Sequence, residues 1–220
     1  MSAGILYIGT KRYSSWSLRG WLVVRLAGLD VTEQVIPLAA GTTPGIAAVS
    51  PSRLVPYLEH DGNQVWDSLA IGEYCAELAP FLWPAERGVR AHARVLSAEM
   101  HAGFRPLRLA MPMNLGRDRA LAGGIAPDVQ ADINRICRLW STTRAQYGAG
   151  GPFLFGAGFG IADAMFAPVV ARLAGYRVPL DDTAAAYRDA VLAHPLMLDW
   201  HAAAASEPAS WRLDRYESIA

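Results

Sequence analysis

The chain has 220 residues, of which 52% are hydrophobic, and equal numbers of acidic and basic residues give it a formal net charge of zero. This composition excludes a disordered chain, and the neutral balance offers no broad basic surface to nucleic acid or to an anionic membrane. The N-terminus lacks the basic start and apolar run of a signal peptide, and no apolar run reaches the roughly 18–20 residues that span a bilayer. We therefore expect a cytoplasmic globular protein. Lys11 is the only lysine and alanine is abundant, a bias typical of GC-rich bacterial genomes.

The first 38 residues predict a strand, a helix and a second strand. Residues 4–9 form an apolar run, residues 16–27 carry apolar side chains at helical spacing, and Gly28 suits the left-handed position after a helix. Residues 31–38 are rich in β-forming side chains. A strand, helix and strand in this order predict a parallel pair joined by a right-handed crossover.

A loop and a hairpin follow. Residues 39–55 are loop-like, with room for a short helix at 44–49. An Asp-Gly dipeptide at 61–62 separates two β-like segments, 56–60 and 63–66. Because Asp-Gly between such segments is a strong hairpin signal, we expect two antiparallel strands here.

From residue 67 onward the pattern is helical. Asp67 and Ser68 can cap a helix that Pro80 ends. Pro106 would kink the next helix and Pro112 would end it. The further helices are expected at residues 86–111, 127–148, 161–173, 183–193 and 195–206.

The composition changes at residues 80–84, where the strand signals have ended, and this change predicts two domains. Residues 1–82 would form an α/β domain and residues 86–220 an all-α domain. The only cysteines, Cys75 and Cys137, lie inside helical patterns and are expected to be buried free thiols. No spacing of cysteines or histidines suits a metal ion, so we expect no metal.

Two serines, Ser14 and Ser15, stand between the first strand and the first helix. A serine there caps the helix, because its side-chain oxygen accepts a hydrogen bond from a free N–H of the first turn. A helix N-terminus also favours negative charge, and a serine hydroxyl can donate a hydrogen bond to a thiolate. The pair is therefore a candidate thiolate site as well as a cap.

Two further pairs have both a structural and a binding interpretation. Pro56 suits the edge of a strand, but a cis bond after Val55 would present the Val55 N–H and C=O to a peptide ligand. Asp67 and Ser68 suit a helix cap, but they also match the ammonium and the carboxylate of an α-amino-acid head group.

Taken together, these pairs resemble a known family. The segments SSWSLR at 14–19, SRLVPYLEHDG at 52–62 and DSLAIGEYCAEL at 67–78 resemble the thioredoxin-like N-terminal domain of the glutathione S-transferases. The segment GIADAMFAPVV at 160–170 is similar to the motif around a buried aspartate in the helical domain of that family. The Ser-Ser-x-Ser-x-Arg pattern is most similar to the zeta class, which includes maleylacetoacetate isomerases.

The resemblance implies a glutathione-binding α/β domain, an all-α acceptor-binding domain and a homodimer. By analogy Ser14 donates a hydrogen bond to the glutathione sulfur and Ser15 helps to fix the helix start, with the division between the two left open. The residues that would bind glutathione are Arg53, Val55, Pro56, Asp67 and Ser68.

The resemblance also implies a pocket for the acceptor substrate between the two domains. Tyr13, Trp16 and the segment 100–113 would line this pocket. The candidates within that segment are Met100, Phe104 and Met111, which suit the hydrophobic core equally well.

Three positions depart from the family pattern. Trp16 stands where the zeta class has a cysteine, which argues against isomerase activity and against a cysteine-based mechanism. Leu54 stands where a glutamine is usual. Gly160 replaces the Ser or Thr that normally caps a helix together with Asp163, so that half of a capping box is missing.

The sequence therefore predicts a glutathione S-transferase of the detoxification type, which activates the thiolate of glutathione with a serine and uses it against small hydrophobic electrophiles. Two alternatives stay open. One is a zeta-like, glutathione-dependent cis–trans isomerase of the maleylacetoacetate type. The other is a non-catalytic protein that binds glutathione or another ligand on the same fold.

Overall fold

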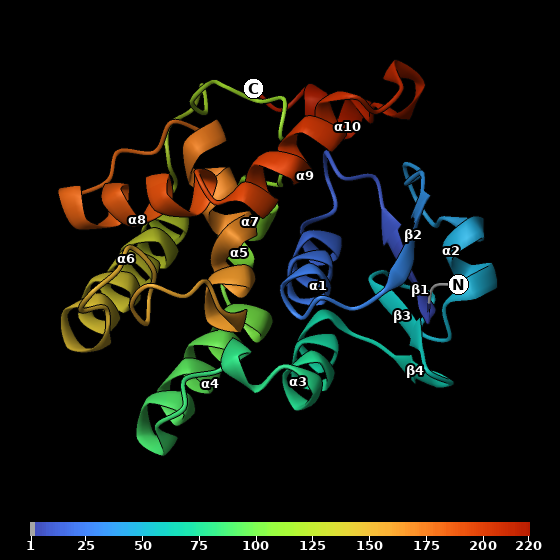
Figure 1. The fold of residues 1–220 in the computed structure, drawn as a ribbon. Helices are drawn as coiled ribbons and strands as arrows, with labels where there is room; N and C mark the ends of the chain where they lie inside the picture. The colour runs from blue at the N-terminus through green and yellow to red at the C-terminus, as the bar shows by residue number, and fades with distance from the viewer. Residues whose placement is uncertain (1–2) are drawn as a thin grey trace.

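A four-stranded sheet with its helices lies beside a bundle of helices (Figure 1). The computed structural model describes residues 3–220. All named strands of this range come before residue 66, and the elements that follow are helical. The expected α/β part followed by an all-α part is therefore confirmed.

The sheet has the strand order β2-β1-β3-β4. Its strands are β1 (Gly4–Gly9), β2 (Val31–Ile36), β3 (Tyr57–His60) and β4 (Asn63–Val65). The strands β1 and β2 are parallel, because helix α1 (Ser15–Leu26) crosses between them, whereas β3 is antiparallel to both β1 and β4. The parallel pair and the hairpin agree with the sequence.

The turns follow the glycine and aspartate signals of the sequence. Gly28 has a φ of 70° just after α1, and Asp61 and Gly62 have φ values of 48° and 77° in the tight turn between β3 and β4. Positive φ at both central residues of a two-residue turn matches the right-handed twist of the paired strands. The backbone at these three positions therefore needs residues that tolerate the left-handed region.

Different helices cover the two faces of the sheet (Figure 1). Helices α1 and α3 (Ser68–Leu78) lie between the sheet and the helical part, and α2 (Pro44–Val49) covers the opposite face. Side chains alternate along β1, so Leu6 joins the main core while Tyr7 packs in a separate cluster with Ile46 of α2. The sheet is thus buried on both faces.

The helical part is organised around α7 (Ile161–Gly175), which is buried along nearly its whole length. Helix α7 packs against α1 of the sheet part and against α4 and α8 of its own part, so it joins the two parts through one core. The other elements of this part are η1 (Pro80–Leu82), α4 (Arg87–Ala102), α5 (Arg105–Ala110), α6 (Pro127–Tyr147), α8 (Asp182–Leu192), α9 (Pro195–Ala205), η2 (Ala209–Trp211) and α10 (Asp214–Glu217).

The expectation of one kinked helix over residues 86–111 is wrong, because the segment forms two helices. Between α4 and α5 the chain is extended at Gly103 and left-handed at Phe104, which has a φ of 60°. Pro106 therefore lies in the first turn of α5, where the N–H that it lacks would have no partner within the helix. It begins a helix rather than kinking one.

A buried carboxylate holds the start of α7. Asp163 Oδ2 accepts the N–H of Gly160 at 3.0 Å, and Oδ1 accepts the N–H of Leu154 at 3.1 Å and the hydroxyl of Tyr187 at 3.0 Å. Burial raises the pKa of Asp163 to about 6, although these three donors act in the opposite direction. Asp163 thus caps α7 without the Ser or Thr that Gly160 replaces.

We predict that Asp163→Ala lowers the free energy of unfolding by about 3 kcal/mol or more, because three donors lose their acceptor in the interior. Denaturant titration followed by circular dichroism measures this loss. The matched control is Asp189→Ala on α8, whose carboxylate is exposed and pairs with the adjacent Arg188. A loss at Asp163 no larger than that at Asp189 would contradict the capping role.

Candidate active site

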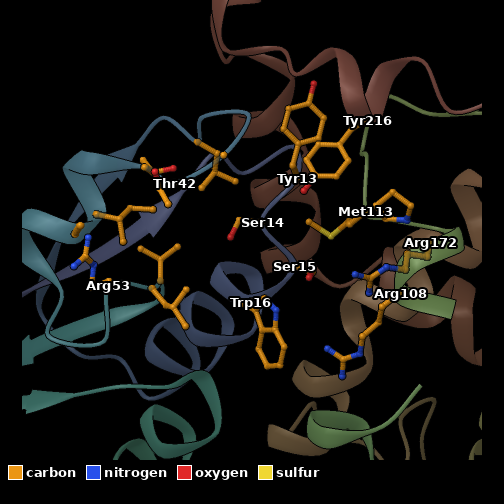
Figure 2. A pocket seen from close by; sticks show the side chains of 18 residues that line it. Tyr13, Ser14, Ser15, Trp16, Thr42, Arg53, Arg108, Met113, Arg172 and Tyr216 are labelled. Carbon is orange, nitrogen blue, oxygen red and sulfur yellow. The ribbon is translucent and has the colours of Figure 1, made fainter. Parts of the chain in front are cut away.

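The N-terminus of α1 opens into a cavity of about 560 Å³ between the sheet part and the helical part. Figure 2 shows Ser14 and Ser15 at the middle of this cavity, with Arg53 on the sheet side and Arg108 and Arg172 on the helical side. A helix N-terminus carries free N–H groups and partial positive charge. The cavity is therefore built to accept an anion at its centre.

Ser14 is the N-cap of α1 and belongs to a short hydrogen-bond chain. Its Oγ accepts the N–H of Ser17 at 3.3 Å, and its hydroxyl donates to the Oγ of Ser17 at 2.7 Å. The Oγ of Ser17 also accepts the N–H of Gly9, at the end of β1, at 2.9 Å. Ser14 is 7% exposed and lines the cavity, so what remains accessible of this side chain faces a ligand.

Ser15 is the first residue of α1 and also lines the cavity. Within residues 3–220, no side-chain hydrogen bond engages its hydroxyl. Both serines therefore line the cavity at the N-terminus of α1, the position at which the sequence analysis proposed a thiolate site. Which of the two would contact a sulfur atom stays a prediction.

Three buried or half-buried arginines lie near the cavity, namely Arg108 and Arg172 of the helical part, which line it, and Arg19 of α1, which does not. Arg172 of α7 is 5% exposed, and its Nε and Nη1 have no hydrogen-bond partner. Burial, followed by the charge of Arg108, lowers the pKa of Arg172 to about 10. Arg19 of α1 is 1% exposed and donates from Nε to Met165 O, while both of its Nη atoms lack partners.

The indole of Trp16 lies between two of these cations. Its ring centroid is 4.8 Å from the guanidinium carbon of Arg19 and 4.9 Å from that of Arg108. An aromatic face attracts a cation, so Trp16 stabilises both charges, in addition to the carboxylate of Asp67, which acts on Arg19, and that of Asp132, which acts on Arg108. Arg108 and Arg172 line the same cavity as Trp16. Arg108 Nε and Nη2 already donate to the backbone carbonyls of Gly103, Met100 and His101, which leaves its Nη1 for a ligand.

The C-terminal segment closes another side of the cavity. Tyr216 lines it, and the Tyr216 ring lies 5.0 Å from that of Tyr13. The hydroxyl of Tyr13 donates to Glu217 Oε1 at 2.5 Å and accepts the N–H of Leu213 at 3.2 Å. Tyr13 is therefore held by the C-terminal segment, and its hydroxyl is not free to donate to a ligand.

The sheet side of the cavity carries Arg53, Leu54 and Val55. Arg53 is exposed and has a φ of 60°, and the Val55–Pro56 peptide bond is cis. Pro56 does not line the cavity but packs against α1, where a Cβ added to Gly20 would lie 2.7 Å from Pro56 Cγ. Arg53 and Val55 thus line the cavity, whereas Pro56 packs against α1, and their contact with glutathione stays a prediction.

Asp67 and Ser68 lie outside the residues that line this cavity. Asp67 Oδ1 caps α3 by accepting the N–H of Leu69 at 2.9 Å, while Oδ2 lies 3.0 Å from His101 Nε2 on α4. His101 in turn packs edge-on against Trp16, at 5.2 Å between ring centroids, which links this pair to the cavity wall. The Oγ of Ser68 is buried and has no hydrogen-bond partner.

Comparison with known proteins decides the family. Models described as the N-terminal and the C-terminal domain of glutathione S-transferase match residues 13–78 and 119–203. The chain belongs to the glutathione S-transferase family. Its four-stranded sheet part corresponds to the thioredoxin-like domain of these transferases, and its helical part corresponds to their C-terminal domain.

Individual glutathione S-transferases support this assignment. Maleylacetoacetate isomerase of Rattus norvegicus is 26% identical over 191 residues, which cover 82% of this chain and 83% of the relative. A transferase homologue from Burkholderia, solved with bound glutathione, is 25% identical with a TM-score of 0.69 and covers 93% of this chain and 99% of its own. A bacterial maleyl pyruvate isomerase of the zeta class shares the fold, with a TM-score of 0.68 at 22% identity over 93% of this chain and 99% of its own.

Some residues expected to line an acceptor pocket do not line this cavity. Tyr13 and Trp16 line the cavity, but Met100, Phe104 and Met111 are buried in the hydrophobic core instead. They join the core that α6 and α7 also build, where burial of large apolar side chains stabilises the helical part. Other residues of the expected segment 100–113 do line the cavity, namely Arg108, Pro112 and Met113, and Arg172 and Tyr216 line it from outside that segment.

Sequence reasoning missed Arg172 and His101, and only one of them has a signal in the sequence that could have found it. Arg172 stands among apolar residues in the second half of α7, and a charge in such a place signals a function. His101 has no such signal, because its partner Asp67 is distant in the chain.

The two cysteines of this chain are free and not activated. Cys75 is buried and Cys137 is half-buried, so the expectation of two buried thiols is correct only for Cys75. Burial raises the pKa of Cys75 to about 12 and that of Cys137 to about 11. Among residues 3–220, no group of three or more His, Cys, Asp and Glu side chains could hold a metal ion, and no helix is long and apolar enough to cross a membrane.

We predict that Asp67→Asn weakens glutathione binding about tenfold or more, because the γ-glutamyl ammonium loses a charge-assisted contact while the α3 cap keeps its oxygen. Isothermal titration calorimetry measures the affinity. The control is Glu86→Gln, since Glu86 caps α4 with two backbone contacts and does not line the cavity. Equal affinities of both variants and the wild-type chain would remove Asp67 from the binding site.

Proposed function

We propose that this chain is a glutathione-dependent enzyme that holds the glutathione thiolate at the N-terminus of α1 and acts on an acceptor with an anionic group. The observation that carries the proposal is the pair Arg108 and Arg172, which line the same cavity as Ser14. Arg172 has unpartnered nitrogens in an almost fully buried side chain. A carboxylate matches the planar, two-pronged geometry of a guanidinium best.

Glutathione would lie along the sheet side of the cavity. Its glycine end would reach Arg53, its cysteine would contact the backbone of Val55, and its γ-glutamyl end would reach Asp67 and Ser68. The unpartnered, buried Oγ of Ser68 supports this placement, since a carboxylate would satisfy it. The ammonium would share Asp67 with His101.

The interactions at this site can supply the free energy needed to ionise the glutathione thiol at neutral pH. A cysteine thiol titrates near 8.5, and a shift of about two units, worth about 2.7 kcal/mol, would keep it ionised at neutral pH. A charge-assisted hydrogen bond contributes about 1.5–3 kcal/mol and a helix N-terminus about 0.3–1 kcal/mol. One serine hydroxyl and the end of α1 are therefore sufficient.

The thiolate would attack an electron-poor carbon of the acceptor. Addition to a double bond conjugated with a carboxylate forms a C–S bond, and a proton from water ends on the adjacent carbon. This reaction gives a glutathione conjugate and defines a transferase. The anionic group held by Arg108 and Arg172 replaces the purely hydrophobic acceptor that the sequence suggests.

A cis–trans isomerase is the second candidate. The thiolate would add to the double bond, the new single bond would rotate, and the thiolate would leave again, so that no atom is gained or lost. The maleylacetoacetate isomerases among the relatives and the arginine pair favour it, whereas Trp16 in place of a cysteine does not. A chain that binds glutathione but neither transfers nor isomerises would be the non-catalytic alternative.

We also propose that the chain forms a homodimer, as the family resemblance implies. Apolar side chains that stay exposed near the junction of α3 and α4 include Leu78, Phe81 and Val95. Such side chains are suited to a contact with a second copy.

We predict that Ser14→Ala raises the pKa of bound glutathione by about one unit or more and lowers turnover, while leaving the affinity for glutathione nearly unchanged. The change removes a donor that acts on the thiolate and not on the rest of the tripeptide. Ultraviolet absorbance of the thiolate, titrated in the complex, measures the pKa. An unchanged value in Ser14→Ala with a raised value in Ser15→Ala would assign the role to Ser15.

We predict that Arg172→Met raises KM about tenfold or more for an α,β-unsaturated carboxylate but not for its methyl ester, because the variant loses a charge-assisted contact with the anion. Steady-state kinetics with the two acceptors measures the difference. The control is Arg188→Met, since Arg188 lies on α8 and does not line the cavity. Equal effects on the acid and the ester would rule out recognition of an anion by Arg172.

A further inference from the structure

We propose that Ser17 is a positioning residue, which donates a hydrogen bond to Ser14 and thereby turns the Ser14 hydroxyl toward the sulfur of bound glutathione. The inference rests on the proposed function, because it assigns a role in activating the same thiolate. It goes further by naming a side chain that does not line the cavity and has no contact with a ligand there.

Ser17 is fully buried, and its hydroxyl oxygen has two hydrogen-bond partners. Ser17 has no exposed surface, and its Oγ lies 2.7 Å from the Oγ of Ser14. The same Oγ accepts the N–H of Gly9 at 2.9 Å, which ties the first turn of α1 to the end of β1. Ser17 is therefore held by a strand, by its own helix and by Ser14 at once.

Only one hydrogen can lie between the two serine oxygens. When Ser14 is the donor, its hydroxyl points to Ser17, and only lone pairs of its oxygen face the cavity. Lone pairs repel a thiolate, so this orientation cannot stabilise one. For Ser14 to donate to the sulfur, the hydrogen between the oxygens has to come from Ser17.

A bound thiolate would favour the reversed direction of the hydrogen bond between Ser14 and Ser17, because the Ser14 hydroxyl could then donate to the sulfur. In the structure Ser14 is the donor to Ser17. A small rotation of the Ser17 side chain, together with rotation of the two hydroxyl hydrogens, would give a chain in which Gly9 N–H donates to Ser17, Ser17 donates to Ser14, and Ser14 donates to the sulfur. Successive hydrogen bonds in such a chain polarise one another and strengthen the last one. Ser14 Oγ would also keep the N–H of Ser17 as a second donor.

Ser15 lacks this support. It lines the cavity, but within the described chain no other side chain donates to its hydroxyl. The difference between two adjacent serines is therefore that one has a buried hydroxyl behind it. The chain from Gly9 through Ser17 favours Ser14 as the donor to sulfur.

The test is a double-mutant cycle on the pKa of bound glutathione. Ser17→Ala in the wild-type background is expected to raise this pKa by roughly 0.5–1 unit and to lower kcat with little change in the Kd for glutathione. In the Ser14→Ala background the same change is expected to shift the pKa no further, because the hydroxyl that Ser17 turns is already absent. Ser17→Thr, which keeps the hydroxyl, should restore the wild-type pKa.

Ser97→Ala is the matched control. Ser97 is also fully buried in a helix, but its hydroxyl donates to Ala93 O in α4, away from the cavity, so its loss should leave the pKa of bound glutathione unchanged. If Ser17→Ala does not fold, Ser17→Cys replaces the hydroxyl with a weaker donor of similar shape. The acid limb of its kcat/KM profile against pH should then shift upward.

The outcomes separate this inference from the proposed function. If the pKa of bound glutathione is low in the wild type and rises in Ser14→Ala but not in Ser17→Ala, the role of Ser17 alone is overturned. A shift by Ser17→Ala that is equally large with and without Ser14 would overturn it too, since the effect would then be structural. A wild-type chain that binds glutathione without lowering its pKa would overturn the proposed thiolate site together with this inference.

Discussion

Helix α1 is enclosed by both parts of the molecule, and the site follows from that enclosure. Leu18, Leu22 and Val23 have no exposed surface, because the helix packs on the sheet part and α3 on one side and on α7 on the other. A helix that is buried all round can meet a solute only at an end, and its N-terminal end faces the cavity. The burial that joins the two parts therefore also decides which end of the helix opens into the cavity, where the proposed anion would bind.

The same packing places cations in an apolar interface. Arg19 of α1 and Arg172 of α7 are almost fully buried and retain guanidinium nitrogens without partners. An unpaired buried cation opposes folding, so the apolar contacts of both helices and the Asp163 cap have to offset it. Stability is reduced at the place where an anionic ligand would restore it, and a ligand that binds only the folded chain stabilises that chain.

Features that depend on neighbours in the chain can be predicted from the sequence, whereas those that depend on distant contacts cannot. Gly28 and the serine pair are set by local backbone geometry, so the turn and the location of the site follow from the sequence. Pro106 suits a kinked helix and a first helical turn equally well, and only the packing of α4 on α7 and of α5 on α6 selects the second. The sequence around Met100 does not show whether its side chain lies in the core or at the cavity. The sequence around His101 does not show that its partner is Asp67. Arg172 does offer a signal, because it is a charged residue among the apolar residues of the second half of α7.

The presence of Trp16 at the mouth of α1 affects how the site responds to oxidation. No cysteine in residues 3–220 lines the cavity, and the buried Cys75 thiol stays protonated because burial raises its pKa to about 12. Glutathione disulfide entering the cavity would thus meet no protein thiolate with which to exchange. The site would bind or release glutathione disulfide without forming a mixed disulfide. Its activity would then follow the concentration of reduced glutathione and not the ratio of the two forms.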